Sequence, residues 1–262
     1  MLSKLWHHDT MSDEQGFTLI ECAIVLAVIG LLAGGVMVGQ NMVESARMRA
    51  ANTEAQLYSH AIGMFHEKYA GLPGDLPNAT TFWGDNPALC SDASIADGDL
   101  GTCNGNGDMI VQSVNLPNAS SEQMQMWTQL SRAELIAGRY SGATAATADG
   151  LGRYDTGVAG VNVPRSEAES QAKWNSASFV AGAPDASLFN RVANFTLTLA
   201  GADFSVQQMH MIDKKLDDGL PATGMIFTNW RCSTASDGNN FTAAYAMNNA
   251  NAVCDMYIIP RY

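Results

Sequence analysis

Residues 16–38 read GFTLIECAIVLAVIGLLAGGVMV, an apolar run interrupted by a single acidic side chain, Glu21. About 20 such residues form a helix of roughly 30 Å, which is long enough to cross the hydrocarbon core of a bilayer. A carboxylate costs roughly 2.5–3.5 kcal/mol at the centre of a membrane helix, and less toward either end. The position of Glu21 therefore predicts a cationic partner that offsets this cost.

An α-amino group is the cation that processing of the chain could supply. If the chain is cut between Gly16 and Phe17, the new amine lies four residues before Glu21. When such helices pack side by side, the amine of one subunit can neutralise Glu21 of its neighbour. Such a cut would therefore supply the cation that Glu21 requires as helices of this kind pack together.

The order Gly16, Phe17, Thr-Leu-Ile-Glu and an apolar helix resembles the N-termini of type IV pilins and of type II secretion pseudopilins. This resemblance implies a leader that ends at Gly16, cleavage by a membrane-embedded prepilin peptidase, N-methylation of Phe17, and pairing of Glu21 with a neighbouring N-terminus. The implied partners are other pilin or pseudopilin subunits, the prepilin peptidase and an inner-membrane assembly platform. The implied location is the inner membrane before assembly and a periplasmic or extracellular filament afterwards.

Two simpler explanations of the apolar run remain open. A secretory signal peptide has a basic start and a small-residue cleavage site after its apolar core, whereas this start sets Lys4 against three acidic residues. A plain signal anchor explains the hydrophobicity but neither Gly16 nor Glu21. The leader starts at Met1 or Met11, and its charge does not support the expected orientation, since positive charge usually marks the cytoplasmic side.

The helix is expected to continue beyond the membrane. From Val43 to Tyr69, apolar residues recur mostly at three- or four-residue steps, which predicts an amphipathic helix. Gly71, Pro73 and Gly74 then end it. The expected organisation is a leader at 1–16, a transmembrane and assembly helix at 17–40, an amphipathic continuation at 41–70, and a periplasmic or extracellular globular domain at 71–262.

Two further helices are predicted in the globular domain. Ser120-Ser121-Glu122-Gln123 matches a capping box and predicts a helix of about four to five turns that ends at Gly138. A short helix is expected over 207–216. Residues 71–118 and 141–187 are expected to be irregular, because they are rich in turn-forming residues and hold few apolar clusters.

Strand signals appear late in the chain. Residues 195–199 alternate with period two and predict a strand, and Gly201-Ala202 predicts a turn after it. Further strands are expected at 225–228 and 256–259. The expected fold class is α+β, with the long N-terminal helix packed on an antiparallel sheet in a pilin-like arrangement with large loop insertions.

Composition narrows the classes of function. The formal charge is −12, and residues 1–16 hold one lysine and three acidic residues, so the processed chain carries about −10. An acidic surface repels phosphate backbones, so no nucleic-acid partner is expected. The sequence has no His-Glu-x-x-His, Gly-x-Ser-x-Gly, phosphate-loop or Cys-x-x-Cys pattern. We expect that the chain is not an enzyme. The alternative class of function is a membrane-anchored exported enzyme.

Four of the five cysteines lie in the polar region, where an oxidising compartment would let them pair. Four cysteines allow three connectivities. We favour Cys90–Cys103 and Cys232–Cys254 because short loops close easily, and four reduced thiols are the alternative. The second pair also fits the resemblance, since pilins commonly staple a C-terminal loop in this way.

One segment suggests a cation site. Residues 97–108 alternate oxygen-bearing side chains with glycines, and calcium takes about six to eight oxygen ligands. The spacing does not fit an EF-hand, and Asp or Asn beside Gly is also common in turns. Calcium is the only cofactor suggested, and its candidate ligands are Asp97, Asp99, Asn104, Asn106 and Asp108.

The function predicted from these features is to form part of a filament rather than to catalyse a reaction. The chain is expected to be a prepilin-like subunit of a type IV pilus or of a type II secretion pseudopilus. The alternative is a minor or tip subunit that binds a surface or an exported protein. The domain is larger than a small repeating subunit requires, and the excursion from Gly71 to Asn118 could supply a recognition surface.

Overall fold

The computed structural model describes residues 18–86, 90, 101–112, 120–147, 157–179, 193–234 and 242–260. The chain divides into two compact units, Met1–Ser45 and Ala46–Tyr262. One helix, α1 (Leu19–Tyr69), runs through both of them. The two units are therefore described one at a time.

The first unit consists of the apolar part of α1. In the part of the chain that the structure describes, α1 is the one helix long and apolar enough to cross a membrane. The helix continues without interruption to Tyr69, which confirms the predicted continuation. It ends where Ala70 adopts a left-handed φ of 55° and its N–H bonds to the His66 carbonyl oxygen.

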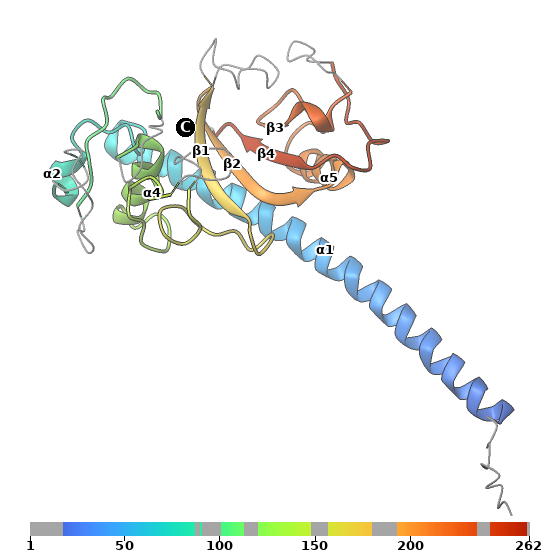
Figure 1. Cartoon of the computed structure of the whole chain (residues 1–262). Coiled ribbons are helices and arrows are strands. Elements are labelled where there is room, and N and C mark those ends of the chain that lie inside the picture. Colours follow the sequence, from blue (N-terminus) through green and yellow to red (C-terminus); the bar gives the residue numbers. More distant parts are fainter. Residues whose placement is uncertain are drawn as a thin grey trace, which may run out of the picture. The chain divides into compact units, whose positions relative to one another are not determined.

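The second unit contains a four-stranded antiparallel sheet in the order β1-β2-β4-β3 (Figure 1). In register, Leu197 of β2 pairs with Ser176 of β1 and with Ile258 of β4. The predicted α+β class is confirmed. The strands are β1 (Lys173–Phe179), β2 (Ala193–Phe204), β3 (Ile226–Thr228) and β4 (Cys254–Ile258).

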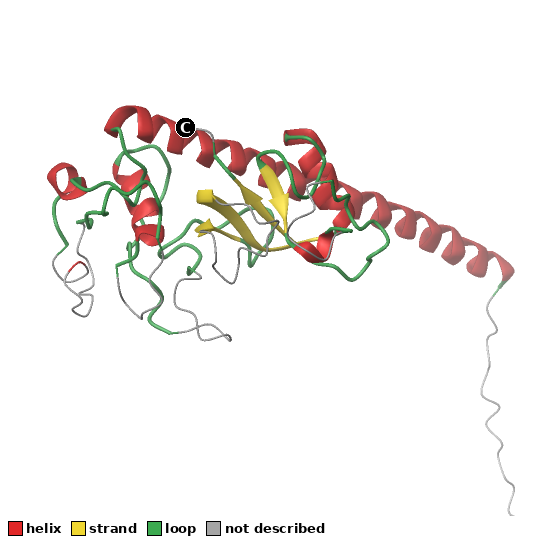
Figure 2. Ribbon diagram, turned by 90° about the horizontal axis from the view of Figure 1, so that it is seen from above, coloured by secondary structure: helices red, strands yellow, loops and turns green. Residues whose placement is uncertain are grey.

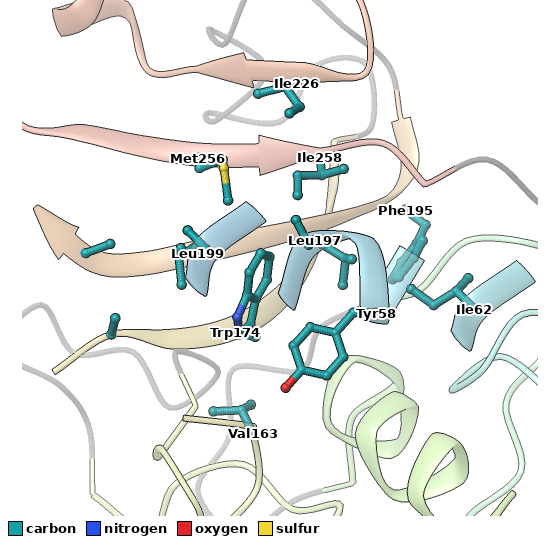
Figure 3. Packing of buried hydrophobic residues seen from close by; sticks show 14 of the residues in the cluster. Tyr58, Ile62, Val163, Trp174, Phe195, Leu197, Leu199, Ile226, Met256 and Ile258 are labelled. Carbon is teal, nitrogen blue, oxygen red and sulfur yellow. The ribbon is translucent and has the colours of Figure 1, made fainter. Parts of the chain in front are cut away.

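The second half of α1 packs on one face of this sheet, as the amphipathic pattern predicts. Tyr58 lies between Trp127 and Trp174, with ring centroids 5.2 and 5.4 Å away and edge-to-face geometry. Figure 3 shows Tyr58 and Ile62 of α1 facing the side chains that the strands direct inward, such as Leu197. Aromatic side chains of this size dominate the burial of apolar surface in a core.

Residues on alternate positions of the strands form a smaller cluster on the other face. The Phe227 ring stacks on Tyr257 at 5.2 Å, and Ile259 packs against Phe227. Since successive strand residues point to opposite faces, Tyr257 is directed away from its buried neighbours Met256 and Ile258. Both faces of the C-terminal part of the sheet are therefore covered by apolar contacts.

Two of the strand predictions are wrong. Residues 141–187 were expected to be loop-like, yet they contain β1, in which Trp174 and Ser176 are buried at alternate positions. A serine at an inward position hides the period-two pattern. The turn expected at Gly201-Ala202 is a shift of register inside one strand, where Gly201 has a φ of 72°. Such a bulge lets β2 continue to Phe204.

Of the remaining helices, α4 contacts β1 and α5 contacts β3, whereas α2 lies near the end of α1, where Trp83 packs on Tyr69 (Figures 1 and 2). The predicted short helix is confirmed as α5. Its N-terminus carries a capping box that we did not predict, in which Ser205 and Gln208 exchange hydrogen bonds between side chain and backbone. The elements are α2 (Ala79–Trp83), α4 (Glu122–Arg132), α5 (Val206–Leu216) and a 3-10 turn, η2 (Trp230–Cys232).

The predicted helix α4 is present and begins within the predicted motif, but its capping box and its end were predicted wrongly. The N-cap is Ser121, which makes no side-chain capping bond, so the expected capping box does not form. Gln123 instead donates through Nε2 to the Ser176 carbonyl oxygen of β1. The helix ends at Arg132 rather than Gly138, because Glu134 adopts a left-handed φ of 60°.

Both favoured disulfides are present in the structure. Cys90 is bonded to Cys103 and Cys232 to Cys254, with Cα–Cα distances of 5.5 and 5.8 Å. The second bond joins η2 to β4 and so closes the C-terminal loop onto the sheet.

Candidate functional site

The candidate site lies at the start of α1, where Glu21 is bonded to Thr18. The Thr18 backbone N–H and its hydroxyl donate to Glu21 Oε2 at 2.8 and 2.7 Å, and the Glu21 N–H donates back to Thr18 Oγ1 at 3.3 Å. This reciprocal pattern is a capping box, with Thr18 as N-cap and Glu21 three residues on. Gly16 and Phe17, the predicted processing residues, lie outside the described residues.

The capping box gives Glu21 a role within its own subunit that the sequence analysis missed. A helix leaves its first N–H groups without intrahelical partners, and a carboxylate in the first turn also interacts favourably with the helix dipole. The sequence pattern that could have predicted this capping box is Thr-x-x-Glu at 18–21. Part of the cost of placing a carboxylate in the apolar run is therefore offset within the chain itself.

The apolar run is exposed on all sides in the isolated chain. Every residue from Thr18 to Val43 is exposed, and Leu19 and Leu31 retain 92% and 78% of their accessible surface. A helix that is apolar all round requires an apolar environment, which is either lipid or other helices. Cys22 is exposed on this surface as a free thiol.

Two charged side chains of α1 anchor the start of the second unit to the segment before β1. Arg47 donates through Nε to the Ala168 carbonyl oxygen at 2.7 Å and forms an ion pair with Glu169. Glu54 accepts from the Ser166 hydroxyl and from the Trp174 indole N–H. These contacts fix α1 against the sheet just after the exposed apolar run ends.

The calcium candidates that the structure describes are engaged in turns. Asn104 Oδ1 accepts from the Thr80 N–H at 2.9 Å. Asn106 donates to Asp108 Oδ2, and the Asp108 N–H donates to Asn106 Oδ1, at 3.1 and 2.9 Å. Asp97 and Asp99 lie outside the described residues, so calcium binding at this segment stays a prediction.

Two further carboxylates accept hydrogen bonds from the backbone of the same loop. Their contact with it was not predicted from the sequence. Asp75 accepts the N–H groups of Gly107 and Met109 at 2.6 and 2.7 Å. Glu122 accepts those of Asn106 and Gln112 at 3.1 and 2.8 Å. Burial raises the pKa of Asp75 and Glu122, although these hydrogen bonds act in the opposite direction. The loop is thus built around carboxylates as acceptors of backbone N–H groups.

Residues 11–37 match the family described as the prokaryotic N-terminal methylation motif, which is the hallmark of type IV pilins, pseudopilins and similar prepilin-like proteins. The match covers the predicted processing site and the first part of α1, and it does not reach the second unit. No curated protein and no solved structure matches the chain.

Proposed function

We propose that this chain, which carries the N-terminal methylation motif, is a subunit of a type IV pilus or of a type II secretion pseudopilus. It is cleaved after Gly16, methylated at Phe17 and polymerised through α1. The observation that carries the proposal is the match at 11–37 on a helix whose apolar surface is exposed all round. Before assembly, such a helix fits anchoring in a membrane.

Assembly then transfers the apolar part of α1 from lipid to the matching surfaces of other subunits. The side chains stay in an apolar environment throughout, so the transfer costs little hydrophobic free energy. Glycines with a spacing of four would let helices approach closely. Gly30 and Gly34 form one such pair and Gly35 and Gly39 another, and an added Cβ at any of them would meet nothing within 4 Å in the isolated chain.

Glu21 can cap its own helix and pair with a neighbour at the same time. Both bonds from Thr18 go to Oε2, and within the described residues no hydrogen bond to Oε1 is formed. An ionised carboxylate has about four acceptor positions on its two oxygens. The free Oε1 is therefore available to the α-amino group of Phe17 from the next subunit, which supplies the cation that the sequence predicts.

Substitutions at Glu21 and Thr18 separate these two roles. Glu21→Gln keeps a residue that serves at this position of a capping box but removes the charge. We expect it to be cleaved and to stay in the membrane, with its content in the filament fraction reduced on the order of tenfold, the factor that a loss of about 1.4 kcal/mol gives. The measurement is quantitative immunoblotting of filament and membrane fractions.

Thr18→Ala is the matched control for that experiment. It removes the hydroxyl of the capping box and leaves the carboxylate charge, so filament content should remain close to that of the unsubstituted chain. Normal incorporation of Glu21→Gln would contradict pairing with the amine. Loss of incorporation in Thr18→Ala alone would show that capping is the role that matters.

The size of the second unit supports a second candidate, a minor or tip subunit that binds a surface or an exported protein. This unit spans residues 46–262 and includes the loop that carboxylates hold at 104–112. Stoichiometry in purified filaments distinguishes the two roles. Many copies per filament support the structural subunit, and a few copies support the tip role.

A further inference from the structure

The turn after α5 brings together three carboxyl groups. Asp213 on α5 is fully buried, and Asp217 and Asp218 follow the helix. One carboxylate oxygen of each lies within 4.8 Å of one from each of the others. These residues are called the carboxyl triad below.

Asp213 connects three parts of the fold. Its Oδ2 accepts from the Tyr245 hydroxyl at 2.7 Å, and its Oδ1 accepts from the Gly219 N–H at 3.2 Å. Tyr245 lies in the loop that the Cys232–Cys254 disulfide closes. A single buried carboxyl group therefore links α5, the turn at 217–225 and the C-terminal disulfide loop.

The other two members of the triad shape the turn itself. Asp217 Oδ2 accepts from the N–H groups of Met225 and Ile226, the latter at 2.9 Å and at the start of β3. Asp218 accepts from the Leu220 N–H at 2.8 Å and from the Thr223 hydroxyl at 2.6 Å. The path from α5 to β3 thus depends on acceptor oxygens that lie beside Asp213.

Ionising all three of these carboxyl groups costs free energy because like charges repel, and burial of Asp213 increases that cost. Burial raises the pKa of Asp213 to about 7, while the hydrogen bonds from Tyr245 and Gly219 lower it and the charges of Asp218 and Asp217 raise it. Burial also raises the pKa of Tyr245 well above its usual range, so Tyr245 remains a donor. Like charges that share a site commonly retain one proton between them.

We propose that the carboxyl triad is a pH-sensitive switch: while Asp213 holds a proton the turn at 217–225 stays closed against α5 and the disulfide loop, and loss of that proton to water loosens it. In an opened turn Asp213 would titrate near the ordinary aspartate pKa of about 3.9. The closed state therefore binds a proton that the open state releases. Opening should become more favourable as pH rises from about 4 to about 7 and should level off above that.

The ionisable groups that act on Asp213 come from two elements packed against it. They are Asp217 and Asp218 from the turn and Tyr245 from the disulfide loop. His210, on α5 itself, places its ring 5.1 Å from that of Tyr245. Because its ring contacts that of Tyr245, His210 needs its own control.

Hydrogen exchange of the full chain in detergent micelles tests the proposal, with EDTA present to remove divalent cations. Peptides covering 214–228 are followed from pH 4.5 to 8.5 and corrected for the intrinsic dependence of exchange on pH. Their protection should fall by about tenfold or more between pH 5 and pH 7 and then stay level. Asp213→Asn, which has no proton to lose in this range, should remove this dependence.

Two variants that change the environment of Asp213 should shift the levelling point, the pH above which protection stays level, in opposite directions. Tyr245→Phe removes a donor to the carboxylate and shifts it to higher pH, whereas Asp218→Asn removes a negative charge and shifts it to lower pH. His210→Gln should leave it in place. Protection that does not depend on pH, an unchanged profile in Asp213→Asn, or a shift in His210→Gln would overturn the proposal. If Asp213→Asn does not fold, the absence of opposite shifts in the other two variants overturns it.

Discussion

At the scale of single residues, Glu21 and Glu54 lie on the same helix in different surroundings. Glu21 is exposed and accepts two hydrogen bonds from Thr18 at Oε2, and among the described residues no hydrogen bond reaches its Oε1. Glu54 accepts three hydrogen bonds from residues more than a hundred positions away in the sequence. The first carboxylate is therefore the one that the proposed assembly would use, and the second stabilises the fold of one chain.

Removal of the Glu54 carboxylate should destabilise the second unit. Its three donors are the Ser166 hydroxyl at 2.5 Å, the Glu167 N–H at 2.7 Å and the indole N–H of Trp174 at 2.7 Å. Trp174 is fully buried, so its N–H would be left without an acceptor. Glu54→Ala should lower the free energy of unfolding by about 3 kcal/mol and Glu54→Gln by about 1 kcal/mol, measured by chemical denaturation.

Glu67→Ala is the control on the same helix. Glu67 is exposed, and its substitution should change the free energy of unfolding by less than about 0.5 kcal/mol. Equal losses in Glu54→Ala and Glu67→Ala would show that the hydrogen bonds of Glu54 do not stabilise the fold.

At the scale of elements, the segment Leu72-Pro73-Gly74-Asp75 follows α1 in the chain and contacts α4. Leu72 is fully buried, and the Gly74 N–H donates to Gln129 Oε1 of α4 at 2.7 Å. Gly74 has a φ of 92°, and a Cβ on it would lie 2.2 Å from the carbonyl oxygen of Glu122. The close approach of this turn to the first turn of α4 therefore requires glycine.

Gly74→Ala should separate α4 from the end of α1. The added methyl group meets backbone and the backbone conformation is strained, so we expect a loss of about 3 kcal/mol in the free energy of unfolding. Gly160→Ala is the matched control, because Gly160 has a φ of 78° but nothing within 4 Å of its added Cβ. It should cost about 1 kcal/mol. Thermal unfolding of both variants measures the difference, and equal losses would contradict the proposed clash.

Sequence patterns predicted the elements whose apolar spacing is regular. Helices α1 and α5 and strands β3 and β4 lie where they were expected, with small shifts of their ends. Strand β1 was missed because Ser176 is buried at an inward position. The length of α4 was misjudged because its end depends on the backbone conformation of Glu134, which no apolar pattern encodes.

Some residues of the candidate site were predicted from the sequence and some of their contacts were missed, for physical reasons. Glu21 stood out because one charge in an apolar run is easily seen, whereas its bond to Thr18 was overlooked despite the Thr-x-x-Glu spacing. Asp75 and Glu122 lie 47 positions apart in the numbering and meet at one loop only after folding, so local patterns do not reveal them. The same holds for Asp213 and Tyr245.

At the scale of the whole molecule, the two units differ in the contacts that stabilise them. The second unit contains the sheet, its apolar core and both disulfides, so its contacts are internal. The first unit exposes apolar side chains that nothing in the described part of one chain covers. Its stability therefore depends on lipid or on other subunits, as the proposed assembly requires.

Mass spectrometry of the N-terminal peptide from the mature protein tests the central claim most directly. Expression with a prepilin peptidase should give a chain that begins at Phe17 and carries one added methyl group, and Gly16→Glu should remain uncut. A mature chain that begins upstream of Phe17, or one cut after the apolar run, would contradict the account.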